Sequence, residues 1–87
     1  MMQIFNQLRV YPNPVENEIN ISSNQPIIVP DLIIIDPLGR EIKPKISSIL
    51  SDKCLKLDVS QLTSGVYHLA TRTENGNTST TFVISRN

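Results

Sequence analysis

Short apolar runs recur along the whole chain, and proline, glycine or asparagine interrupts them about every ten residues. Within several runs apolar and polar residues alternate, as in strands with one buried face and one wet face. Helical periodicity is weak throughout. The pattern predicts about seven antiparallel strands in an all-β sandwich or barrel rather than a βαβ fold.

Before the final hairpin, the strand pattern is carried by Leu8–Tyr11, Glu18–Ser22, Leu32–Ile35, Arg40–Lys43 and Cys54–Asp58. Ile19 and Ile21 are expected to face the core, and so are Leu55 and Leu57. Because Leu32–Ile35 is apolar at every position, this strand is expected to be covered on both sides. Turns are predicted at Tyr11-Pro12-Asn13-Pro14 and Asp36-Pro37-Leu38-Gly39.

Two connecting segments also carry specific signals. Asp58 and Ser60 can each accept a backbone N–H that opens a short helical turn through Leu62, and Gly65 can close this turn in a left-handed conformation. The segment Ile27-Ile28-Val29-Pro30 is unusually apolar, which predicts an extra edge strand or a contact surface.

Tyr67 lies in a Leu-x-x-Gly-x-Tyr spacing, and its hydroxyl is expected to bond back to the preceding connection, as in immunoglobulin-like sandwiches.

The final hairpin contains Asn75-Gly76 between two strand-like runs, which is typical of a two-residue type I′ turn. The opposed pairs are then Glu74 with Asn77, Leu69 with Phe82, and Tyr67 with Ile84. These large apolar side chains share the inner face of the ribbon. The outer face carries His68, Ala70 and Arg72 against Val83, Thr81 and Ser79, so His68 is expected to be at least partly exposed.

Charge and hydropathy narrow the range of partners. The 87 residues carry eight basic and eight acidic side chains, and this zero net charge disfavours binding to nucleic acid or an anionic membrane. The longest apolar run is too short for a membrane-spanning helix, and the start of the sequence lacks a signal-peptide pattern. Cys54 is the single cysteine, so an internal disulfide and a multi-cysteine zinc site are excluded.

Candidate catalytic chemistry is sparse. His68 is the only histidine, and a nucleophilic site would need Ser64 or Cys54 to be brought beside it. An exposed strand histidine is the preferred interpretation. The aspartates lie far apart, in turns, without the dense carboxylate spacing of a calcium loop. We expect no enzyme activity, no cofactor and no metal.

Four blocks together resemble one family, the type A C-terminal sorting domain of bacterial type IX secretion substrates. The blocks are Val10-Tyr11-Pro12-Asn13-Pro14, Ile33-Ile34-Ile35-Asp36-Pro37-Leu38-Gly39-Arg40-Glu41-Ile42, Leu57-Asp58-Val59-Ser60-Gln61-Leu62-Thr63-Ser64-Gly65-Val66-Tyr67-His68-Leu69, and Asn75-Gly76 leading to Phe82-Val83-Ile84. Each block alone is ordinary turn and strand chemistry. Their order and spacing over residues 10–86 carry the resemblance.

The resemblance implies an immunoglobulin-like antiparallel β-sandwich that serves as a C-terminal secretion signal. An outer-membrane translocon would recognise it, and a sortase-like peptidase would remove it from an N-terminal cargo domain absent from this sequence. The route would run through the periplasm and outer membrane to the cell surface or the medium. Residues 1–9 would be a linker remnant and the start of the first strand, with the sorting domain at 10–87, and the paired Met1-Met2 suggests that upstream residues were removed.

We expect the translocon to recognise the end of the final hairpin and nearby positions. The expected recognition residues are Gly65, Tyr67, Gly76, Phe82, Val83, Ile84, Ser85 and Arg86. The alternative is a generic immunoglobulin-like adhesion or carbohydrate-binding module, because a fold does not fix a function. Sugar sites usually display exposed aromatic rings, whereas Tyr67 and Phe82 are expected to point inward and only Phe5 and Tyr11 remain.

Overall fold

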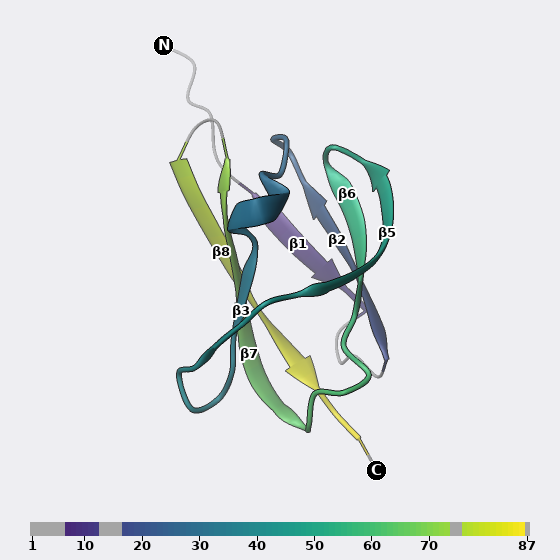
Figure 1. Cartoon of the computed structure of the whole chain (residues 1–87), viewed down its shortest axis with the longest axis vertical. Helices are drawn as coiled ribbons and strands as arrows, with labels where there is room; N and C mark the ends of the chain where they lie inside the picture. The colour runs from purple at the N-terminus through teal and green to yellow at the C-terminus, as the bar shows by residue number, and fades with distance from the viewer. Residues whose placement is uncertain (1–6, 13–16, 74–75, 87) are drawn as a thin grey trace.

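The computed structural model describes residues 7–12, 17–73 and 76–86, with two antiparallel four-stranded sheets (Figure 1). The strands in these residues are β1 (Leu8–Tyr11), β2 (Glu18–Ser23), β3 (Ile33–Ile35), β4 (Glu41–Ile42), β5 (Lys45–Ser51), β6 (Cys54–Asp58), β7 (Gly65–Thr73) and β8 (Gly76–Ile84). The sheet orders are β1-β2-β6-β5 and β4-β3-β7-β8. The expected antiparallel β-sandwich is confirmed, with eight described strands instead of about seven.

The core lies between the sheets and follows the alternation of the strands. Ile19 and Ile21 of β2 are fully buried, as expected, and so are Leu55 and Leu57 of β6 beside them. The other buried apolar side chains are Leu8, Ile27, Leu32, Ile34, Val59, Tyr67, Leu69, Phe82 and Ile84. Both sheets therefore contribute one apolar face and leave the other face to solvent.

The apolar segment around β3 departs from the prediction. Leu32 and Ile34 are buried, but Ile33 and Ile35 are only half-buried, because the outer face of this sheet is not covered by another layer. Antiparallel sheets commonly leave one face open in this way. Strand β3 is therefore covered on one side and not on both.

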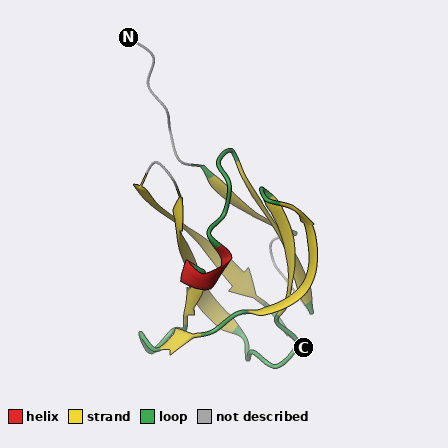
Figure 2. Ribbon diagram, turned by 45° about the horizontal axis from the view of Figure 1, so that its top comes forward, coloured by secondary structure: helices red, strands yellow, loops and turns green. Residues whose placement is uncertain are grey.

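The segment from residue 27 to residue 30 forms no edge strand. The backbone N–H of Ile27 donates to the carbonyl of Asp52 at 2.8 Å, and Ile27 itself is buried in the core. Val29–Asp31 then forms a single 3-10 turn, η1, drawn in red in Figure 2 and in contact with β7. Pro30 lacks the N–H that a strand ladder requires, which favours this turn.

The predicted turn at residues 36–39 is confirmed and joins β3 to β4 as a hairpin. The N–H of Gly39 donates to the carbonyl of Asp36 at 2.9 Å, and Gly39 has a φ of +85°, a conformation that glycine adopts without a Cβ penalty. In the other predicted turn, Pro12 follows β1, while Asn13 and Pro14 lie outside the described residues.

The connection from β6 to β7 contains the short turn expected from Asp58. Its carboxylate accepts the N–H of Ser60 at 2.9 Å, and the N–H of Leu62 donates to the carbonyl of Val59 at 3.0 Å. Gly65 does not close the turn in the left-handed conformation. It has a φ of +158° and begins β7, and a Cβ on it would lie 2.7 Å from Cγ of Pro37.

The register of the final hairpin differs from the prediction by two residues. Tyr67 pairs with Phe82, Gly65 pairs with Ile84, and Thr73 pairs with Gly76. Asn75 lies outside the described residues, and Gly76 is the first residue of β8. The observed register stacks the rings of Tyr67 and Phe82, with centroids 5.6 Å apart, so packing in the core outweighs the local turn preference. An even shift keeps every side chain on its predicted face.

Gly65→Ala should lower the free energy of unfolding by about 2 kcal/mol, because the added methyl group has to displace Pro37. In a Pro37→Ala background Cγ is missing, and the same substitution should cost clearly less; the remaining cost reflects the φ of +158° at Gly65, which L residues rarely adopt. Urea unfolding of the four variants in this cycle measures the difference. An equal cost of Gly65→Ala in both backgrounds would show that the contact with Pro37 does not require glycine.

Candidate functional site

Three segments that are distant in the sequence meet at one end of the sandwich. They are the β3–β4 turn (residues 36–40), the β6–β7 connection (residues 59–64) and the two residues after β8 (85 and 86). We call this region the crossover end; it lies at the bottom of Figure 1. A surface hollow between the turn and the connection is lined by both of them and by Tyr67. This region also contains the start of β7 and the end of β8.

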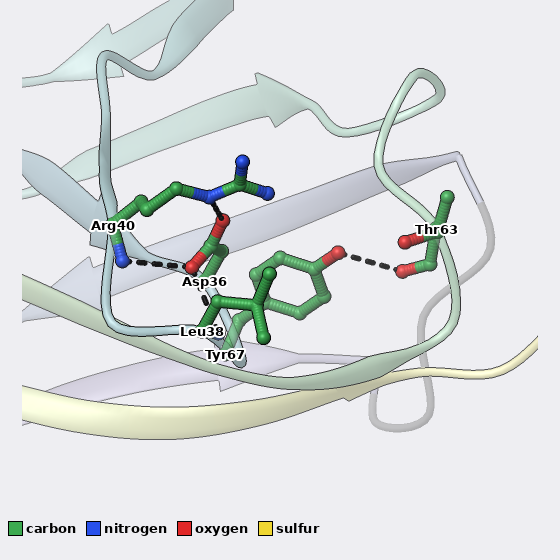
Figure 3. Close-up of polar contacts among 5 residues, drawn as sticks. All are labelled: Asp36, Leu38, Arg40, Thr63 and Tyr67. Carbon is green, nitrogen blue, oxygen red and sulfur yellow. Dashed lines mark hydrogen bonds and ion pairs between the residues drawn. The ribbon is translucent and has the colours of Figure 1, made fainter.

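The carboxylate of Asp36 organises the β3–β4 turn (Figure 3). Its Oδ1 accepts the backbone N–H groups of Leu38 and Arg40 at 2.9 and 2.8 Å, and its Oδ2 accepts Nε of Arg40 at 2.7 Å. These bonds, above all the backbone N–H of Arg40, lower the pKa of Asp36 below its usual value. The buried carboxylate thus fixes a turn whose Leu38 side chain is 78% exposed.

Tyr67 joins the connection to the core, as its position in the sequence predicted. Its hydroxyl donates to the carbonyl of Thr63 at 2.7 Å, and the side chain is only 2% exposed (Figure 3). The other end of the side chain, its ring, stacks on Phe82 of β8. One residue therefore fixes the β6–β7 connection and the last strand relative to each other.

Arg86 makes four hydrogen bonds to other parts of the chain. Its Nε and Nη2 each donate at 2.7 Å, to the carbonyls of Leu62 and Val59 respectively. Its Nη1 donates to Oδ1 of Asn17 at 3.2 Å, and its backbone N–H donates to Oγ of Ser64 at 2.9 Å. The planar guanidinium thereby spans the connection and the residue that precedes β2.

The structure divides the eight expected recognition residues by exposure. Tyr67, Phe82 and Ile84 are buried; Gly65 and Arg86 are half-buried; Val83, Ser85 and Gly76 are exposed. Seven of them lie at or near the crossover end. Gly76 lies at the opposite end of β8, roughly 26 Å away for a strand of this length, and is not brought together with the others.

Val66, like Leu38, is exposed at this end and was not among the expected recognition residues. Val66 is 49% exposed and pairs across the strands with Val83, which is 37% exposed. Strand alternation could have identified it, since Val66 is adjacent to Tyr67 and must face the other way. The two valines form a small apolar patch on the outer face of the sheet.

The residues considered for catalysis are not assembled into a site. His68 is exposed, as predicted, and its Nδ1 lies 3.1 Å from Oγ1 of Thr81. Cys54 belongs to β6 in the other sheet, and Ser64 accepts the bond from Arg86. Within residues 7–12, 17–73 and 76–86, no cluster of three or more His, Cys, Asp or Glu residues is placed to hold a metal ion.

The aromatic side chains divide between the core and the surface. Tyr67 and Phe82 point inward, as expected; Tyr11 is 45% exposed, and Phe5 lies outside the described residues. In the described part of the chain, no helix has the length and apolar character needed to cross a membrane.

In a comparison with known protein families, one family model matches this chain. The model of the secretion system C-terminal sorting domain matches residues 9–85. Curated proteins give no match. The matched range includes all eight strands of the structure except the first residue of β1, and it includes the whole β6–β7 connection.

Tyr67→Phe should lower the free energy of unfolding by about 1 to 1.5 kcal/mol, because the carbonyl of Thr63 loses its donor in a partly buried site. Tyr11→Phe is the matched control, since Tyr11 is largely exposed, and it should leave stability unchanged. Chemical denaturation measures both. Equal midpoints for Tyr67→Phe and the unmodified chain would contradict the structural role of the hydroxyl.

Stability should fall in acid as Asp36 and Asp58 take up protons. Both have a folded pKa below the ordinary value of 3.8, Asp58 chiefly through its bond with the side chain of Ser60. A lowered folded pKa adds stability above pH 3.8, and this stability is lost as the pH falls through the folded value. Asp36→Asn should therefore be less stable than the unmodified chain at pH 7, with the difference shrinking toward pH 2. The free energy of unfolding of both proteins, measured by denaturation at each pH, tests this. A difference that stays constant from pH 7 to pH 2 would rule it out.

Proposed function

This chain belongs to the secretion system C-terminal sorting domain family and is a C-terminal signal for type IX secretion, and we propose that the translocon recognises the crossover end of its folded sandwich. Three observations support this location. The exposed apolar side chains Val66, Val83 and Leu38 lie at this end. The backbone beneath them is held by Tyr67 and Asp36. A fixed apolar surface is typical of protein recognition sites.

The expected recognition residues would then have two different roles. Val83 and Ser85, together with Val66, would contact the translocon directly. Tyr67, Phe82 and Ile84 would support that surface from within the core, since none of them is more than 2% exposed. Gly65 would allow the β3–β4 turn to approach β7, and Gly76 would be contacted only by a receptor that extends along the whole of β8.

We also propose the fate of the domain after export. The route would pass through the periplasm and the outer membrane to the cell surface or the medium. A sortase-like peptidase would cut within or before residues 1–9, a linker remnant that includes the start of β1, and release an N-terminal cargo from the sorting domain at 10–87. The position of β1, beginning at Leu8, supports a cut upstream of the sandwich.

The domain would perform no catalysis and would need no cofactor. Sorting domains are a family of secretion signals and not an enzyme family. The separation of His68 from Cys54 in two different sheets supports the absence of a nucleophilic site. Any activity of the secreted protein would then belong to its cargo.

The test is export of a reporter fused in front of this chain, in a host that has the type IX system. Val66→Thr together with Val83→Thr keeps β-branched side chains but removes the apolar surface, and should reduce export about tenfold if two methyl contacts are lost. Deleting β8 would be less informative, because Phe82 and Ile84 belong to the core.

The matched control is Ile49→Thr together with Leu50→Thr on β5, two exposed apolar side chains that are neighbours in the sequence. This variant should be exported like the unmodified fusion. Equal export of both double variants, with unchanged unfolding midpoints, would exclude the valine patch as the recognition surface.

A further inference from the structure

We infer that Arg86 is a positioning residue that holds the end of the signal in place through contacts within the domain, and does not itself bind the secretion machinery. The inference deepens the proposed function and depends on it for the identity of the recognised surface. It rests on the four hydrogen bonds of Arg86. No sequence pattern indicated them, since Arg86 simply follows the last apolar strand.

The position of β8 explains why such a contact is needed. This strand lies at the edge of its sheet next to β7, and it also contacts β1 of the other sheet. Its last registered pair is Ile84 with Gly65. Beyond that pair, the backbone N–H of Arg86 bonds to Ser64 and its side chain bonds to the same connection. These bonds fix the chain at Ser85 and Arg86, directly after the registered pairs that place Val83.

Three of the five N–H groups of the Arg86 guanidinium are engaged within the chain. Nε, Nη1 and Nη2 each donate to an acceptor within the chain, and two of these acceptors are backbone carbonyls in partly buried surroundings. A receptor carboxylate that paired through Nε and the N–H of Nη2 already in use would leave the carbonyls of Leu62 and Val59 without these donors. The geometry therefore favours an internal role.

The contact also explains why an arginine is suited to this position. The acceptors on Val59, Leu62 and Asn17 are reached by three separate nitrogens of one rigid plane. A lysine ammonium is a single point with the same charge and cannot span them. Arg86→Lys therefore separates the two roles, since it retains the charge that an acidic receptor would need and loses the internal geometry.

The experiment measures thermal unfolding of the chain and export of the reporter fusion for four variants. Arg86→Lys should lower Tm by about 8 °C, as expected for the loss of one or two hydrogen bonds in a domain of this size. Ser64→Ala, which leaves Arg86 itself intact, should lower Tm by about half as much. Asn17→Asp should raise Tm, because its carboxylate strengthens the bond to Nη1.

The fourth variant is a core substitution, Ile21→Val, or Ile21→Ala if needed, chosen to match the Tm of Arg86→Lys; Ile21 lies in β2, outside the crossover end. Export of Arg86→Lys should be reduced several-fold below that of this Tm-matched control. An unchanged Tm for Arg86→Lys would overturn the inference, and so would export equal to the control. If the unmodified fusion is not exported, the proposed function fails, while the three Tm values still decide whether the internal contact stabilises the domain.

Discussion

The sandwich depends on the packing of Tyr67 against Phe82, a cross-strand pair on the core-facing side of one sheet. Tyr67 lies near the start of β7 and Phe82 near the end of β8, and both are essentially inaccessible to solvent. The hydroxyl of Tyr67 extends this contact to the β6–β7 connection. Because Phe82 and Ile84 are core residues, the strand that would present the proposed recognition surface is also part of what holds the domain together. The inner face of β8 therefore cannot be changed without affecting the fold, whereas its exposed outer face can.

Strand alternation was sufficient to assign most residues to a face. Ile19, Ile21, Leu55 and Leu57 are buried as predicted, and the predicted inner face of the last hairpin is correct although its register is wrong by two residues. The period of two explains both results, since an even shift moves the pairs without exchanging the faces. Register depends on which side chains pack in the core, and the Asn75-Gly76 signal contained no information about that.

The candidate site was harder to predict from the sequence, because contacts between residues far apart in the chain form it. The tyrosine bond spans four residues and follows a recognisable spacing, so it could be predicted. The bonds of Arg86 reach back 24, 27 and 69 residues, and no local pattern indicates them. Likewise, the need for glycine at position 65 arises from Pro37 in another hairpin. These contacts exist only once the strands have been arranged in space.

The central claim is that β8 is an integral part of the core, and residue-resolved amide hydrogen exchange of the unmodified chain tests it most directly. The hydrogen-bonded amides of β8 around Phe82 should exchange only through global unfolding, with the same free energy as those of β2 and β6. If β8 instead exchanged through local opening, with a free energy several kcal/mol below that of β2 and β6, the last strand would be an appendage and the account would be wrong.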